Sequence, residues 1–470
     1  MVHLTTALDP ASAVPLYEQL YRSLAAEMRA GTLTAGTRMP GKRRLAAELS
    51  VSVNTVDTAY QMLAAEGYLT ARERSGFTVQ EYLALPQGVQ PPAAPSAPAA
   101  AHPADTAPPV QFDLSTRGVD PGLFPFRTWA RLQKELLYSA PELLTPGDAR
   151  GDAALRQALA GYLAEYRGVQ CDPEQLVVGA GLEYLLGLLA PLLPGPAAVE
   201  TPGYPRARQV LENNGVPCRC LPVDADGLSL TALSASDAAV CYVTPSHQFP
   251  TGVTMPAGRR AELLHWAARA PGRRYIIEDD YDSEFRYASR PIPALRELDR
   301  EGRVIYVNTF SKSLAPGLRI GYLVLPDALM ARYRERFSLY AATVSSFDQF
   351  TLAAFMHSGG FERHISRSRK VYQARRDALM AALDRELADL PHEVSRSEAG
   401  LHLLLHMRNG MLEHELIERA KASGVRVYPL SAYYTPPVKP PRATLVLGYA
   451  GLTEQQIDEA AKLLKQAWTK

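Results

Sequence analysis

The chain has 470 residues, of which 47% are hydrophobic, and its 50 basic residues nearly balance 49 acidic ones, giving a formal net charge of +1. This length and apolar fraction predict two or three domains with packed cores, while the balanced charge excludes a basic field over the whole molecule and an acidic disordered chain. Any contact with nucleic acid must therefore come from a local basic patch.

About 80 residues at the N-terminus predict three helices followed by a hairpin. Apolar residues recur at helical spacing over 16–28, a short helix is predicted over 44–49, and a third over 54–66. Residues 67–79 predict two short strands around a turn. This order is typical of a winged helix-turn-helix, an α+β DNA-binding domain, over 1–80.

A stretch of alanine, proline and small polar residues follows this predicted domain. Such a composition cannot bury a core, and its prolines keep the chain extended. A long surface loop is the alternative, but featureless loops of this length are uncommon in compact domains. We therefore predict a linker over 81–111.

From residue 112 to residue 470, helical and strand patterns alternate. Apolar strands are predicted over 239–243, 275–277, 304–307, 401–406 and 443–448. Buried strands between helices indicate a mainly parallel sheet that is covered on both faces. The last two strands predict a smaller C-terminal α+β subdomain beside this α/β domain.

The cysteines and the N-terminus favour a cytoplasmic protein. The four cysteines form no Cys-x-x-Cys pair and no Cys/His spacing suited to zinc, so we expect reduced thiols and no metal site. The N-terminus lacks the pattern of a signal peptide. The most apolar stretch, 181–199, contains Glu183 and three prolines, so we expect no contact with a membrane.

Charged and hydroxyl side chains follow two of the predicted strands. Lys312 comes shortly after strand 304–307, and the ends of strands in an α/β sheet are where ligands bind. A lone lysine there usually extends into solvent, but Arg319 follows seven residues later, and Asp279 and Asp280 end another strand. A solvated acidic pair is the alternative for the two aspartates. Together, however, these residues favour a cofactor site.

Three stretches carry a family resemblance: TPSHQFPTG at 244–252, IIEDDYDSEFRY at 276–287 and NTFSKSLAPGLRIGY at 308–322. They resemble the pyridoxal 5′-phosphate (PLP) enzymes of fold type I, and their exact residues are similar to motifs in the aminotransferase domain of MocR/GabR-type regulators. The resemblance extends over essentially the whole chain, linker included. It implies a fold type I PLP-dependent transferase-like domain over 112–470, PLP as the cofactor and a homodimer.

The resemblance also implies roles for individual residues in binding PLP. The implied contacts are Lys312 with the aldehyde as a Schiff base, Asp279 with the pyridinium nitrogen, Tyr281 with the phenolate oxygen, Tyr204 with the ring face, and Arg319, Thr309, Ser311 and the backbone of Gly181 and Leu182 with the phosphate. An ordinary packed tyrosine is the alternative for Tyr204.

Two departures from the aminotransferase pattern argue against amino-acid turnover. Those enzymes usually place asparagine before Pro-Thr-Gly, where it contacts the phenolate oxygen, whereas this chain has Phe249, with His247 or Gln248 as substitutes. They also carry an arginine in the last strand that clamps the substrate carboxylate. Losing such a clamp costs about 1.5–3 kcal/mol of binding. Residues 445–449 contain no arginine, and the candidates nearby in sequence are Arg206, Arg426 and Arg442.

The segments PLYEQL, AGTRMP and AEGYL resemble a GntR-type winged helix, with its recognition helix starting near Ser52. The family usually has arginine after this serine, whereas this chain has Val53, and losing such a contact costs ~1–3 kcal/mol of base discrimination. A winged helix used only for protein contact is the alternative. The residues predicted to bind an operator in double-stranded DNA are Lys42, Arg43, Arg44, Ser52, Asn54, Thr55, Arg72 and Arg74.

Two functional hypotheses follow from these features. The favoured one is a PLP-dependent transcriptional regulator that senses PLP, or an amine or amino acid, through aldimine chemistry on Lys312. Its DNA affinity would change with the differential binding of that ligand. The alternative is an active aminotransferase with a vestigial winged helix.

Overall fold

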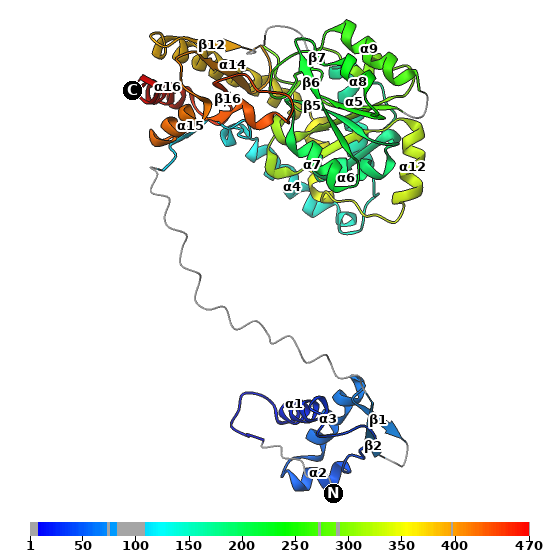
Figure 1. Cartoon of the computed structure of the whole chain (residues 1–470). Coiled ribbons are helices and arrows are strands. Elements are labelled where there is room, and N and C mark those ends of the chain that lie inside the picture. The colour runs from blue at the N-terminus through cyan, green and yellow to red at the C-terminus, as the bar shows by residue number, and fades with distance from the viewer. Residues whose placement is uncertain are drawn as a thin grey trace. The chain divides into compact units, whose positions relative to one another are not determined.

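The computed structural model describes residues 8–72, 76–81, 109–270, 274–287, 292–395 and 398–469. The chain divides into two compact units, Met1–Asp105 and Thr106–Lys470, which we describe separately (Figure 1). Most of the predicted linker, 81–111, lies outside the described residues, as does Arg74.

The first unit contains the three helices and the hairpin that the sequence predicts. Its elements are α1 (Leu16–Arg29), α2 (Lys42–Glu48), α3 (Val53–Ala65), β1 (Leu69–Arg72) and β2 (Gly76–Val79). Ser52 caps α3, because its hydroxyl accepts a hydrogen bond from the Thr55 amide at 3.0 Å. The apolar faces of α1 and α3 meet in a core that includes Leu24, Tyr60 and Phe77. The winged helix-turn-helix prediction is thus confirmed.

The second unit is built on an eight-stranded sheet in the order β4-β11-β10-β9-β8-β5-β6-β7. The strands are β4 (Leu176–Gly179), β5 (Ala197–Thr201), β6 (Cys218–Asp224), β7 (Gly227–Leu228), β8 (Val240–Val243), β9 (Tyr275–Asp279), β10 (Val304–Thr309) and β11 (Gly321–Val324). The five from β10 to β6 are parallel, whereas β11 and β7 are antiparallel to their neighbours. The predicted, mainly parallel sheet is confirmed.

Helices cover both faces of this sheet. Along β10, Ile305 and Val307 belong to one apolar cluster with helices α6, α7 and α12, whereas Tyr306 belongs to another with α4, α5 and α13. The α-helices between residues 126 and 357 are α4 (Phe126–Ser139), α5 (Ala153–Arg167), α6 (Leu182–Leu189), α7 (Pro205–Asn213), α8 (Leu230–Ala235), α9 (Ala257–Ala268), α10 (Leu295–Leu298), α11 (Phe310–Ser313), α12 (Asp327–Phe337) and α13 (Ser346–His357).

A smaller antiparallel sheet forms the C-terminal subdomain, in the order β12-β13-β16-β15. Its elements are β12 (His392–Ser395), β13 (His402–Met407), α15 (Glu413–Ala422), β15 (Tyr428–Pro429), β16 (Thr444–Gly448) and α16 (Glu454–Thr469). The two strands predicted here correspond to β13 and β16. A separate parallel pair joins β3 (Phe112–Asp113) to β14 (Val425–Arg426), so the start of the unit lies against its C-terminal subdomain.

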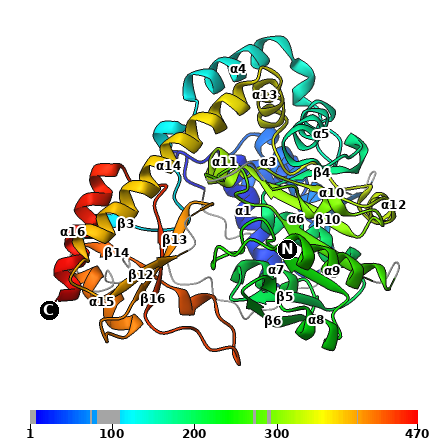
Figure 2. The same cartoon turned by 90° about the horizontal axis from the view of Figure 1, so that it is seen from above.

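The helix α14 (Gly360–Glu386) connects the two parts of this unit (Figure 2). Its first turns contribute Phe361 and Ile365 to the core beneath α4, α5 and α13, while Leu379 and Leu383 belong to the core of the C-terminal subdomain. Neither α14 nor any other helix within the described ranges combines the length and the apolar character needed to cross a membrane.

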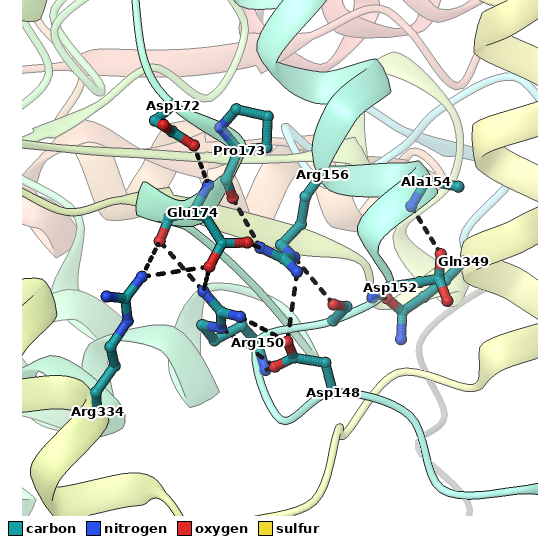
Figure 3. A network of polar contacts seen from close by, with 11 residues as sticks. Asp148, Arg150, Asp152, Ala154, Arg156, Asp172, Pro173, Glu174, Arg334 and Gln349 are labelled. Atoms are coloured by element: carbon teal, nitrogen blue, oxygen red, sulfur yellow. Dashed lines mark hydrogen bonds and ion pairs between the residues drawn. The ribbon is translucent and has the colours of Figure 1, made fainter.

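A network of ion pairs fixes the N-terminal end of α5 (Figure 3). Glu174 accepts hydrogen bonds from Arg150 at 2.5 Å and Arg156 at 2.7 Å, and Arg334 of α12 lies 3.3 Å away. Asp148 pairs with Arg150 at 2.7 Å. The two arginines, Arg150 chiefly, lower the pKa of Glu174 to about 2. The network thereby ties α5 and α12 to the segment that precedes β4.

Candidate functional site

A cavity of about 460 Å³ lies at the carboxyl ends of β9 and β10. The two strands are parallel, with Val307 opposite Asp279, so the residues that follow each strand meet at one edge of the sheet. The predicted site residues that line this cavity are Leu182, Tyr204, Arg206, Asp279, Tyr281, Thr309, Ser311, Lys312 and Arg319.

Lys312 lies on α11, directly after β10. Its ammonium group donates a hydrogen bond to the backbone oxygen of Thr116. Burial lowers the pKa of Lys312 to about 8, and the positive charge of Arg117 acts in the same direction against the opposing effect of Asp282. Near pH 7 far more of this amine is therefore neutral than in an exposed lysine, and the neutral amine is the form that attacks an aldehyde.

Asp279 ends β9 and is only 4% exposed. Its Oδ2 accepts a hydrogen bond from the Tyr242 hydroxyl, while its Oδ1 has no partner among the described residues. Burial, together with the nearby charges of Asp280 and Asp282, raises the pKa of Asp279 to about 7. A buried carboxylate with one free oxygen at a cavity wall is suited to a cationic ring nitrogen, whose charge would stabilise the ionised form.

The opposite end of the cavity is suited to an anion. Gly181, with φ +86°, caps α6, and a Cβ atom at this position would lie 2.5 Å from a guanidinium nitrogen of Arg319. Arg319 pairs with Glu183 at 2.6 Å, and Arg206 pairs with the other oxygen of that carboxylate at 3.1 Å. A phosphate here would meet the positive end of a helix and an arginine, in competition with Glu183.

His247 lies behind Tyr281 instead of lining the cavity. Its Nδ1 is 3.0 Å from the Tyr281 hydroxyl and 2.9 Å from Asp282 Oδ2. A Cβ atom at Gly400 would lie 2.0 Å from the imidazole Cε1, so the backbone there packs directly on the ring. His247 can therefore influence a bound ligand through Tyr281, Asp282 or His402, whose ring centroid is 5.1 Å from its own and which lines the cavity.

Gln248 also stays outside the cavity wall, because its side chain stabilises its own loop. Its amide nitrogen donates to the backbone oxygens of Pro202 at 2.9 Å and Phe249 at 2.7 Å, and its amide oxygen accepts from the Thr251 amide at 3.1 Å. Phe249 itself lines the cavity, with its ring edge-on to Tyr204.

Of the three arginines considered for a carboxylate ligand, only Arg206 lines the cavity. Arg426 lies on β14 at 3.8 Å from Asp113, and Arg442 is exposed just before β16. Tyr449, which follows β16, is buried and donates its hydroxyl to the Gly400 oxygen at 2.7 Å. The residue after the last strand thus supplies a structural hydrogen bond, and β16 itself contains no arginine.

Several lining residues escaped the sequence analysis: Thr116, Arg117, Glu183, Asp282, Tyr428 and Tyr433. Thr116 and Arg117 reach the cavity because β3 pairs with β14, more than 300 residues further along the chain. No local pattern indicates such a pairing. Glu183 and Asp282 could have been identified from the sequence, because each is close in sequence to a predicted site residue.

The predicted DNA-contacting side chains gather around α2 and the start of α3. Lys42 forms an ion pair with Asp57 of α3, and Arg44 pairs with Glu48 at 2.8 Å. The Arg44–Glu48 pair is exposed and the Lys42–Asp57 pair is half-buried, so a phosphate group can replace Glu48 at little cost. Arg43 is exposed.

The beginning of the recognition helix presents polar and apolar groups side by side. Val53 is 46% exposed, Asn54 is exposed and Thr55 is half-buried. Ser52 uses its hydroxyl to cap the helix. Arg72 ends β1, on the wing. The side chains of Asn54 and Val53 are thus accessible to solvent at the start of this helix.

Comparison with protein families gives two matches that divide the chain. Residues 16–79 match the model of bacterial regulatory proteins of the gntR family. Residues 118–464 match aminotransferase class I and II. Among solved structures, the chain is similar to a kynurenine aminotransferase of Pyrococcus horikoshii, with a TM-score of 0.67 and 28% identity over 76% of this chain and 90% of that one. The predicted fold type I architecture is thus confirmed.

Two regulators are similar to the chain over almost its whole length. The uncharacterized HTH-type transcriptional regulator YdeL of Bacillus subtilis is 41% identical over 99% of both chains. The probable rhizopine catabolism regulatory protein MocR of Rhizobium meliloti is 36% identical over 98% of this chain and 95% of its own. The chain therefore belongs to the MocR-type HTH transcriptional regulators, in which a DNA-binding domain of the gntR family is joined to an aminotransferase class I and II domain.

Proposed function

We propose that this regulator holds PLP in the cavity at the ends of β9 and β10 and adjusts its DNA binding to the ligand bound there. The observation that carries the proposal is the arrangement of a neutralisable lysine, a buried carboxylate with one free oxygen and an arginine beside a glycine cradle in one cavity. When bound, PLP supplies an aldehyde and an electron-withdrawing ring.

Each residue in the cavity has a defined task in this proposal. Lys312 would hold the cofactor through its aldehyde, and Asp279, with its free Oδ1, would hold the ring nitrogen. Arg319 and the amide groups after Gly181 bind the phosphate, together with Thr309 and Ser311. Tyr204 covers the ring face. Tyr281 donates its hydroxyl to the phenolate oxygen and is oriented from behind by His247, which is 3.0 Å away.

The effector in this proposal is PLP itself, or an amine or amino acid that takes the place of Lys312 on the cofactor. Arg206 and Arg117, which both line the cavity, are suited to the carboxylate of an amino acid. A ligand that binds differently to two conformations shifts their balance, and affinity for DNA changes by the same coupling free energy.

We further propose that the regulator acts as a homodimer in the cytoplasm. Large apolar side chains are exposed on and after α4 and after α12, among them Phe126, Tyr138, Leu144 and Leu339, which is 98% exposed. Exposed large apolar side chains of this kind are typical of a protein–protein interface. Light scattering measures the oligomeric state, and a monomer at micromolar concentration would contradict this part of the proposal.

The cofactor site is tested by absorption spectroscopy of the full chain mixed with PLP. We expect a new absorption band that Lys312→Ala abolishes. Gly181→Ala should weaken PLP binding because of the 2.5 Å contact with Arg319, whereas Gly317→Ala is a matched control with no atom within 4 Å of the added Cβ. Equal affinities of these two glycine variants would contradict the phosphate assignment.

The regulatory role is tested by footprinting DNA upstream of the chain's own gene. A protected sequence whose occupancy changes with added PLP or amine supports the proposal, and Lys312→Ala should abolish the change while retaining the protein's fold. Occupancy that does not respond to any ligand would contradict sensing. Rapid exchange of amino groups between an amino acid and a keto acid, without operator binding, would favour the active aminotransferase.

A further inference from the structure

A second cavity, of about 360 Å³, lies between α5, the start of α14 and the segment that follows β9. Its walls include Tyr162 and Tyr166 of α5, Glu284, and Ile365 and Arg369 of α14. It shares no lining residue with the cavity that contains Lys312. The proposed PLP chemistry therefore gives this second cavity no role.

One of the buried carboxyl groups in this cavity is unsatisfied. Glu284 is 6% exposed, and its Oε1 accepts a hydrogen bond from the Tyr162 hydroxyl at 3.3 Å. Its Oε2 is buried and has no partner among the described residues. The half-buried Glu362, on the same cavity, likewise has a buried Oε2 without a partner in the described part of the chain. A buried carboxylate in this condition is costly, and a cation supplied from outside would remove that cost.

The basic groups of the cavity do not neutralise these carboxylates. Arg167 is committed to Asp280, with two hydrogen bonds of 2.7 and 3.0 Å. Arg363 is exposed and donates to the Ser358 oxygen at 2.9 Å. The half-buried Arg369 donates through Nε to the backbone oxygen of Glu284 at 2.9 Å, which leaves the remaining nitrogens of its guanidinium group for a ligand. Glu284 Oε2 and Glu362 Oε2 thus stay unpaired within the described residues, while Arg369 has guanidinium nitrogens available to a ligand.

The apolar part of the wall favours a ligand with a hydrocarbon body. The rings of Tyr162 and Tyr166 are stacked with centroids 5.2 Å apart, and Tyr166 is 40% exposed at the mouth. Aromatic faces attract ammonium groups as well as hydrocarbon chains. A ligand that matches this wall and both charges carries an ammonium group and a carboxylate on the same carbon atom, together with an apolar side chain.

We propose that this cavity is a second ligand site, which binds an amino acid with an apolar side chain. Its ammonium group binds Glu284, with Glu362 as the second acceptor, and its carboxylate binds Arg369. The site is separate from the PLP cavity and does not depend on PLP chemistry.

The test is calorimetric titration of L-leucine into cofactor-free full-length Lys312→Ala, which cannot hold PLP covalently, so leucine meets no aldehyde. We expect one saturable site per chain. Glu284→Gln should weaken binding about 10-fold or more, because it removes a charge-assisted hydrogen bond. Glu418→Gln, at an exposed carboxylate on α15, is the matched control and should leave binding unchanged. N-acetyl-L-leucine, which lacks the ammonium group, and isoamylamine, which lacks the carboxylate, should both bind more weakly than leucine.

A second variant keeps the test independent of any folding defect in Glu284→Gln. Ser366 is exposed on α14 and lines the cavity, so Ser366→Trp should block leucine without removing a buried group. Absence of saturable leucine binding would overturn the proposal, as would binding that neither variant reduces. Loss of binding in Arg206→Ala would place leucine in the PLP cavity and would also overturn it. Because the titration uses neither cofactor nor DNA, its failure is distinguishable from failure of the proposed function.

Discussion

Replacing Arg167 with methionine is expected to destabilise the second unit by about 3–5 kcal/mol, the usual cost of removing one partner from a buried ion pair. Arg167 at the end of α5 donates to both oxygens of Asp280, to the Ile292 oxygen at 2.8 Å and to Ser246 at 3.2 Å. The change leaves Asp280 buried without a counter-charge. Asp280 still accepts hydrogen bonds from Tyr306 at 2.6 Å and Ser283 at 2.8 Å, and these bonds limit the loss of stability.

Tryptophan fluorescence during urea unfolding of the full chain measures this effect cleanly. All three tryptophans lie beyond residue 105, so the signal reports the second unit alone. Adding Asp280→Asn to Arg167→Met removes the unpaired charge and should restore most of the stability. A single variant that costs less than about 1 kcal/mol, or a double variant that costs the sum of the two single changes, would refute the assignment to the ion pair.

The same pair predicts a dependence on pH. Although burial opposes ionisation, Arg167 and Tyr306 hold the pKa of Asp280 below its ordinary value. Without Arg167, burial should raise the pKa of Asp280 above the value that this residue has in the unfolded chain. The stability deficit of Arg167→Met should therefore be smaller at pH 5 than at pH 8, because a protonated Asp280 carries no unpaired charge.

Three further predictions concern single groups. The rate at which PLP reacts with the chain should rise with pH and level off above about pH 8, because burial lowers the pKa of Lys312 to about that value. Stopped-flow absorbance measures this rate. A rate that still rises at pH 10 would contradict the expectation. Arg150 and Arg156 lower the pKa of Glu174 to about 2. The contribution of this half-exposed group to stability, about 0.5–1 kcal/mol, should therefore be present above about pH 4.5 and lost as pH falls towards 2. Glu174→Gln should remove this dependence from acid-unfolding curves. Val53→Arg should steepen the slope of log K for DNA against log salt by about 0.9, as measured by fluorescence anisotropy, whereas Val53→Gln should not.

The sequence predicted most of the fold and much of the cavity because its signals are local. Lys312, Arg319 and Asp279 follow strands whose apolar character is evident, and parallel pairing of β9 and β10 then brings them to one edge. In the first unit, the helical periodicities and the Ser52 cap fix three helices without reference to the rest of the chain.

Features that depend on contacts between distant segments could not be predicted in this way. Arg426 is close in sequence to the cavity residue Tyr428, yet the pairing of β14 with β3 directs it to Asp113. Likewise, the tight packing of Gly400 against His247 determines that the imidazole lies behind Tyr281. Neither arrangement leaves a trace in composition, periodicity or motif spacing.

The bridge that Glu183 forms between Arg319 and Arg206 has a consequence for the response to phosphate ligands. An anion that enters this end of the cavity must displace the Glu183 carboxylate from two guanidinium groups. Breaking these two ion pairs reduces the net free energy of binding. The half-saturation concentration is therefore higher than two free arginines would give. Glu183 thus acts as a built-in competitor, and its strength determines how abundant the anionic ligand must become before the molecule responds.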